Sequence, residues 1–121
     1  MIKITGVVKK GKEEARKLGF KTLNIHSPVD IFSKGVFYGT VYINNNIYNS
    51  VIYIGDNREQ EDEKYQCIEA HLLDSINYNY YDAYCTIKII KKIRNDKKFD
   101  NINDLKEAIK TDIHICSLID E

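Results

Sequence analysis

The sequence predicts an all-β fold with one helix: a six-stranded antiparallel, Greek-key-like β-barrel with a C-terminal α-helix packed on it. Several stretches alternate apolar and polar residues with the period of a strand. They follow one another directly, which favours antiparallel pairing, and closing the sheet into a barrel protects its edges. One apolar stripe at helical spacing follows the last strand, over residues 103–119. Residues 1–121 are therefore predicted to form a single domain.

Short polar segments separate the predicted strands. The strands cover residues 2–8, 35–43, 47–54, 65–73 and 83–93, with a further extended segment over 18–25. Residues 44–46, all asparagine, form a hairpin turn because asparagine tolerates positive φ. In the strand over 65–73, Glu69 lies on the polar face, opposite Ile68 and Ala70.

The C-terminal segment predicts a charged loop followed by a helix. Residues 94–100 are mostly charged and include one aromatic residue, Phe99. Asn101 or Asn103 can cap the helix by accepting a hydrogen bond from a free amide of its first turn. The apolar stripe comprises Leu105, Ala108, Ile109, Cys116 and Ile119.

Composition limits the classes of partner. The chain has 43% hydrophobic and 30% charged residues, which is ordinary for a globular domain. Eighteen basic residues balance eighteen acidic ones, so no overall field favours nucleic acid, and no nucleic-acid partner is expected. No apolar run approaches the roughly 20 residues that span a bilayer, so no membrane association is expected. We expect a cytoplasmic monomer.

The three cysteines lack the spacing of metal ligands. Cys67, Cys85 and Cys116 lie far apart and are odd in number, as expected for thiols of a reducing compartment. They are predicted to be core residues.

The segment over 18–25 carries two oxygen-bearing side chains two positions apart. Thr22 and Asn24 would share one face of an extended segment, while Leu23 and Ile25 face the core. Two neutral oxygens suit Mg²⁺, whose other ligands are often water and nucleotide phosphates. The competing interpretation is that Thr22 and Asn24 belong to a solvated strand face.

The preceding loop, residues 9–17, is rich in charge. Lys12, Arg16 and Lys17, together with Lys21, could bind a phosphate chain. Glu13 and Glu14 dilute this positive charge, which favours the competing interpretation of a solvated loop.

Taken in order, these landmarks resemble the riboflavin kinase family, which includes the kinase half of bacterial bifunctional FAD synthetases. The segment over 15–24 is similar to the family's Gly-Arg-x-Leu-Gly-Phe-Pro-Thr-Ala-Asn signature. Residues 68–74 are similar to its Val-Glu-Val-His-Leu-Leu-Asp, and residues 94–99 to its Arg-x-Glu-x-x-Phe. The resemblance extends over nearly the whole chain.

The resemblance implies phosphorylation of the riboflavin 5′-hydroxyl by ATP to give FMN. It implies Glu69 as the general base, and Thr22 and Asn24 as ligands of Mg²⁺ or another divalent cation. Without the resemblance, Glu69 would be interpreted as a surface ion-pair residue. His71, on the same face, is expected to have a structural role in packing or hydrogen bonding. The residues implied to bind the nucleotide are Gly11, Lys12, Arg16, Gly19, Phe20 and Lys21.

The resemblance also implies a flavin-binding loop that contains Arg94, Asp96 and Phe99. Phe99 would contact the flavin ring, although it could instead staple the loop to the helix. The implied partners are riboflavin and FMN, with ATP and ADP. The chain has no room for an adenylyltransferase domain, so FMN and no FAD is the expected product.

The sequence departs from the family pattern at several positions. Ala15 and Asp82 stand where the family has Gly, Lys21 where it has Pro, and Leu23 where it has Ala. None of these changes removes the oxygens of Thr22 and Asn24. The alternatives are a catalytically impaired homologue that binds flavin or nucleotide, and an interaction barrel that binds neither.

Overall fold

The computed structural model describes residues 2–9, 19–27, 33–55, 67–73 and 80–119. The six strands are β1 (Ile2–Lys9), β2 (Leu23–His26), β3 (Gly35–Ile43), β4 (Asn46–Gly55), β5 (Cys67–Leu72) and β6 (Tyr84–Arg94), and the helix is α2 (Ile102–Ser117). The strands form a closed barrel in the order β1-β2-β5-β4-β3-β6, and every pairing is antiparallel. The predicted fold is therefore confirmed.

The predicted bounds hold to within one or two residues, apart from the early extended segment. Within residues 18–25, the strand begins only at Leu23, so Thr22 lies just before it. Residue 18, like residues 65 and 66 of the strand predicted over 65–73, lies outside the described part of the chain. The predicted asparagine turn is confirmed, because Asn44 and Asn45 have φ values of 48° and 67°.

The barrel interior is apolar, as the alternation of the strands predicts. β5 alternates half-buried and buried residues along its whole length, and its buried residues Ile68, Ala70 and Leu72 are at most 1% exposed. The same core includes Leu23 and Ile25 of β2. Residues between these positions consequently point to the outer face of the barrel.

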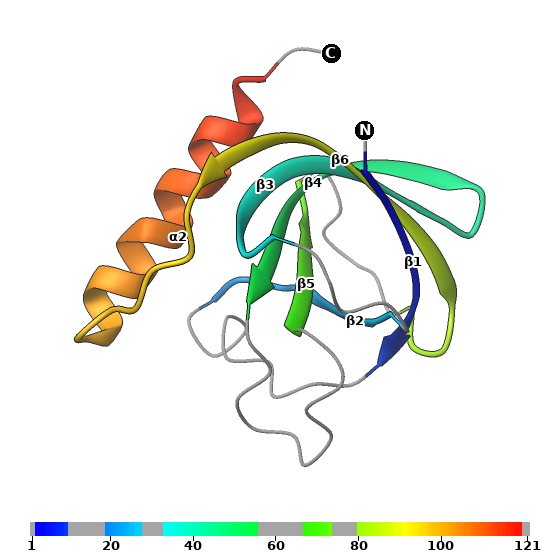
Figure 1. Cartoon of the computed structure of the whole chain (residues 1–121), viewed down its shortest axis with the longest axis horizontal. Coiled ribbons are helices and arrows are strands. Elements are labelled where there is room, and N and C mark those ends of the chain that lie inside the picture. The colour runs from blue at the N-terminus through cyan, green and yellow to red at the C-terminus, as the bar shows by residue number, and fades with distance from the viewer. Residues whose placement is uncertain (1, 10–18, 28–32, 56–66, 74–79, 120–121) are drawn as a thin grey trace.

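The helix packs on the outside of the barrel, against β4 and β6 (Figure 1). It begins at the cap Asn101, whose side chain accepts a hydrogen bond from the Asp104 amide at 2.9 Å. Its contact with the barrel forms a second apolar cluster, made by Val36, Tyr38, Val51 and Cys116 with Tyr53, Leu73, Ile93, Ile113 and Ile119 around them. The helix ends two residues before predicted, yet Ile119 still packs in this cluster.

The described helix is too short and too polar to span a membrane, and the described part of the chain holds no helix that could.

Candidate functional site

Asn24, Glu69 and Tyr53 lie on three neighbouring strands and form a row across the outer face of the barrel. Asn24 of β2 pairs with Glu69 of β5, and Glu69 pairs on its other side with Tyr53 of β4. All three are half-buried and lie between buried neighbours of their own strands, so they share the outer face. Directly paired residues place their side chains about 5 Å apart. We call Asn24, Glu69 and Tyr53 the outer row.

The outer row brings together two residues that the sequence selected separately. Asn24 was expected to bind a metal ion, and Glu69 to act as a base. Both side chains carry oxygens, and the strand pairing makes them direct neighbours. Such a pair can hold a cation beside a carboxylate that accepts a proton.

The segment that leads into β2 is held by a histidine. His71 Nδ1 lies 2.7 Å from the carbonyl oxygen of Lys21, the residue before Thr22. This bond fits the structural role expected for His71. Thr22 and Asn24, on either side of Leu23, are both half-buried. Leu23 is 4% exposed, so the core accommodates leucine at the position where the family has the smaller alanine.

Of the residues expected to bind the nucleotide, three are described. Gly19 has φ +96°, a conformation that favours glycine, as expected for a tight turn. Phe20 and Lys21 follow it and are half-buried. Gly11, Lys12 and Arg16 lie outside the described residues.

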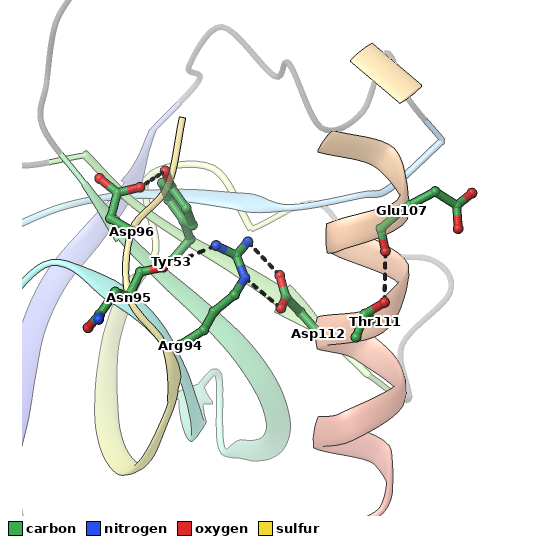
Figure 2. Close-up of polar contacts among 7 residues, drawn as sticks. All are labelled: Tyr53, Arg94, Asn95, Asp96, Glu107, Thr111 and Asp112. Carbon is green, nitrogen blue, oxygen red and sulfur yellow. Dashed lines mark hydrogen bonds and ion pairs between the residues drawn. The ribbon is translucent and has the colours of Figure 1, made fainter. Parts of the chain in front are cut away.

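Tyr53 connects the outer row to the loop between β6 and α2. Its hydroxyl donates a hydrogen bond to Asp96 Oδ1 at 2.6 Å (Figure 2). Burial raises the pKa of this hydroxyl well above its usual value, and the hydrogen bond to Asp96 raises the pKa further. The tyrosine is therefore a neutral hydrogen-bond donor.

A bidentate ion pair holds the end of β6 on the helix. Arg94 Nε donates to Asp112 Oδ1 and its Nη2 to Oδ2, both at 2.8 Å, so the pair is bidentate (Figure 2). These hydrogen bonds raise the pKa of the Arg94 guanidinium, so Arg94 remains charged. Asp112 is only 4% exposed, and the pair supplies its charge balance.

Two cations lie within contact distance of the Phe99 ring. The Arg94 guanidinium carbon and Lys97 Nζ are each 5.6 Å from the centroid of its ring. The structure thus brings Arg94, Asp96 and Phe99 together and gives each a partner within the protein. Their expected contact with a flavin stays a prediction.

Two contacting residues of this site were not selected from the sequence. Tyr53 was predicted only as part of a strand, and Asp112 only as a residue within the helix over 103–119. Asp112 did carry a signal, because it lies four residues before Cys116 on the buried side of the helix. A carboxylate in that position requires a cation, and the nearby Arg94 supplies it. Tyr53 carried no comparable signal.

One departure from the family pattern coincides with a special backbone conformation. Asp82 has φ +67°, and the Ala83 amide donates to the Tyr80 carbonyl at 3.0 Å across the turn. The third position of such a turn has positive φ, so glycine is preferred there and aspartate is tolerated. The Asp82 carboxylate binds Lys9 Nζ at 2.7 Å.

A family model described as "Flavokinase: Riboflavin kinase" matches residues 1–119. A bifunctional riboflavin kinase/FMN adenylyltransferase of Haemophilus influenzae is 34% identical over 114 residues, which covers 92% of this chain and 36% of that protein. The chain spans between 17% and 47% of the length of the first curated relatives that it matches.

Two solved structures share the fold. A riboflavin kinase from Trypanosoma brucei superposes with a TM-score of 0.67 at 22% identity, over 95% of this chain and 76% of that chain. A structure described as a macrolide-efflux protein from Streptococcus pneumoniae superposes with a TM-score of 0.84 at 23% identity, over 98% of this chain and 39% of that chain. At these identities the two structures indicate a common fold.

Proposed function

The chain belongs to the riboflavin kinase family, and from this premise we propose that it transfers the γ-phosphoryl group of ATP to the ribityl 5′-hydroxyl of riboflavin. The products are FMN and ADP. The observation that carries the proposal is the direct pairing of Asn24 with Glu69 on neighbouring strands. It puts a candidate metal ligand beside a candidate base on one face of the barrel.

Glu69 is proposed to orient the riboflavin hydroxyl and to accept its proton. The hydroxyl oxygen forms a bond to the γ-phosphorus as the bond from that phosphorus to the bridging oxygen of ADP breaks. Positioning and charge stabilisation dominate in such transfers, and general-base catalysis contributes roughly 10²- to 10⁴-fold. A half-buried strand residue suits this task, because the strand fixes its backbone on both sides.

Thr22 and Asn24 are the residues proposed to hold Mg²⁺ with the ATP phosphates. Both residues are half-buried and carry neutral oxygens, and Asn24 pairs directly with Glu69, which fits a hard cation that takes other ligands from phosphate and water. When bound, the ion would neutralise charge on the phosphates. We further propose that Gly19, Phe20 and Lys21, with Gly11, Lys12 and Arg16, cover the triphosphate.

The loop that carries Arg94, Asp96 and Phe99 is proposed to bind the flavin. The loop follows β6 and is tied to β4 by Asp96 and to α2 by Arg94. These ties would hold the loop beside the outer row, so that a flavin bound there presents its ribityl chain to Glu69.

The direct test supplies purified protein with riboflavin, ATP and Mg²⁺ and separates the flavins by chromatography. FMN should form and depend on ATP and Mg²⁺, and no FAD should appear. A protein that binds riboflavin without ATP-dependent turnover would refute the proposed activity.

The metal assignment has its own test. Asn24→Ala and Thr22→Ala should raise the KM for MgATP and lower kcat, with partial rescue at higher Mg²⁺, because the missing oxygen is a ligand of the ion. Thr86→Ala is a matched control, since Thr86 is a half-buried threonine on β6, which does not pair with β2. Equal behaviour of Thr22→Ala and Thr86→Ala would remove Thr22 from the metal site.

A further inference from the structure

Tyr53 lies where three parts of the molecule meet. Its backbone pairs with Glu69, its hydroxyl donates to Asp96 at 2.6 Å, and its ring packs beside the apolar cluster under the helix. It therefore touches the strand of the proposed base, the loop of the proposed flavin site and the surface that holds the helix. Neither the sequence nor the family pattern had selected it.

The hydrogen bond from Tyr53 has a fixed direction. Because burial and the adjacent carboxylate keep the phenol protonated, the hydroxyl donates and Asp96 accepts. A hydrogen bond to a charged acceptor is short and about twice as strong as one between neutral groups. Asp96 is thus held at a defined distance from β4.

The second strong interaction of this region, the ion pair between Arg94 and Asp112, does not involve β4. Arg94 and Asp112 connect the end of β6 to the helix, and neither residue belongs to β4 or β5. That ion pair holds the end of β6 on the helix. The bond from Tyr53 determines how far Asp96, two residues further on, lies from the strand that pairs with Glu69.

Gly55 allows the Tyr53 ring to lie where it does. A Cβ atom at position 55 would be 3.0 Å from Cε1 of the ring and 3.5 Å from its hydroxyl oxygen. The 3.0 Å contact is tight enough that the ring would have to shift by a few tenths of an ångström. An alanine at position 55 should therefore weaken the hydrogen bond from the hydroxyl to Asp96 without removing a polar atom.

We propose that Tyr53 is a positioning residue of the phosphoryl transfer, whose hydroxyl holds Asp96 and so places the flavin-binding loop relative to Glu69. This inference rests on the proposed function. It assigns Tyr53 to the riboflavin side of the site, since its hydroxyl contacts the loop after β6 and no described residue of the proposed nucleotide site.

The test compares steady-state kinetics of the wild type with Tyr53→Phe. The variant should raise the KM for riboflavin about tenfold, the size expected for one charge-assisted hydrogen bond, and leave the KM for MgATP unchanged. Tyr42→Phe is the matched control, because Tyr42 also donates its hydroxyl to a side chain, Asn45, but at the exposed β3–β4 turn. It should leave both constants unchanged.

A double-mutant cycle separates positioning from general stabilisation. If Tyr53 acts through Asp96, the variant with both Tyr53→Phe and Asp96→Ala should bind riboflavin no more weakly than Asp96→Ala alone. Additive losses would overturn the proposal. So would a wild-type KM for riboflavin in Tyr53→Phe, whatever its melting temperature.

Gly55→Ala gives a second perturbation should Tyr53→Phe not fold, and it should raise the KM for riboflavin by less than the tenfold expected of Tyr53→Phe. Failure of the proposed function is recognised independently, because the wild type would then make no FMN. In that case the riboflavin Kd, measured by quenching of flavin fluorescence with MgADP present, replaces KM in every comparison. A wild type that neither turns over nor binds riboflavin would overturn both proposals.

Discussion

The inner and outer faces of the β2–β5–β4 sheet are built from the same strands but depend on different properties of their residues. The inner face is a set of apolar side chains, Leu23, Ile25, Ile52, Ile54, Ile68 and Ala70, all at most 4% exposed. The outer face carries the outer row, whose members differ in chemistry. Volume determines whether an inner residue fits, whereas the position of one oxygen determines what an outer residue can do.

This difference separates stability from activity along a single strand. Ile68 and Glu69 are adjacent in β5, yet one points into the barrel and the other away from it. Substitutions at the two positions should therefore affect different measurements.

Glu69→Gln should lower kcat by about 10²-fold or more, because it keeps the shape of the side chain and removes the base. The KM for MgATP and the melting temperature should change little, since the side chain lies on the outer face. Steady-state kinetics with a thermal melt measure both. A variant with near wild-type kcat would remove Glu69 from the mechanism.

Ile68→Ala should have the opposite profile. The residue is 1% exposed, so the lost apolar contacts and the cavity should cost about 2 to 5 kcal/mol of the free energy of unfolding. Well below the melting temperature, kcat should remain within a few-fold of wild type. Ile68→Val, expected to cost about 0.5 to 1.5 kcal/mol, is the graded control. A fall in kcat without a fall in stability would contradict the separation of the two faces.

Chemical labelling of the cysteines tests the same difference between the inner and outer faces. Cys85 faces the interior, and burial raises the pKa of its thiol from 9.0 to about 11, whereas Cys67 is half-buried on the outer face of β5. At pH 8 an alkylating reagent should modify Cys67 well before Cys85, as counted by mass spectrometry with and without urea. Fast labelling of Cys85 in the native protein would contradict the assignment.

The same shift links stability to pH. The pKa of the Cys85 thiol is higher in the folded than in the unfolded protein. The contribution of the protonated, buried thiol to the free energy of unfolding is therefore fully present below pH 9 and is lost as the pH rises towards about 11. Urea unfolding of Cys85→Ala and wild type at pH 8 and 10.5 should reveal a smaller pH-dependent loss in the variant.

Asp112→Ala should lower stability by about 1 to 3 kcal/mol, because it leaves the Arg94 guanidinium without its carboxylate. We expect less than for a fully buried pair, since the Arg94 side chain is 25% exposed. Asp112→Asn should cost less, as one oxygen still accepts a hydrogen bond. Urea unfolding measures both variants, and equal losses would indicate that charge alone matters.

The alternation of residues was sufficient to predict the strands of the barrel and the opposite faces of Ile68 and Glu69. It could not predict that Asn24 and Glu69 are neighbours, because β2 and β5 are distant in sequence and pair only through the order of strands in the closed barrel. The resemblance to a family selected both residues without giving their contact. The same limit applied to Tyr53 and Asp96, whose bond joins residues 43 positions apart.

The apolar stripe predicted for the helix could not identify every residue of its buried face. It correctly included Cys116, which is buried, but an apolar stripe cannot include Asp112, which is equally part of the buried face. A buried carboxylate becomes favourable only through a specific partner, and Arg94 comes from another element. Patterns of one element contain no information about such a partner.

The smallest effects are expected at the exposed ion pair between Lys9 and Asp82. Lys9→Ala removes an ion pair whose side chains are 47% and 78% exposed, and should cost less than about 0.5 kcal/mol. Asp82→Gly removes the same ion pair but also relieves the positive φ of 67°. The greater freedom of glycine in the unfolded chain offsets part of that gain, so Asp82→Gly alone should be close to neutral.

Adding Asp82→Gly to Lys9→Ala isolates the backbone contribution, because the ion pair is already absent in that background. We expect it to recover up to about 1 kcal/mol of the free energy of unfolding, as measured by urea unfolding. The KM for riboflavin should remain that of the wild type in all three variants, since the outer row and the loop after β6 are unchanged. A destabilising effect of Asp82→Gly in the Lys9→Ala background would mean that Asp82 makes a favourable interaction besides the ion pair, and that the aspartate at this glycine position contributes to the fold.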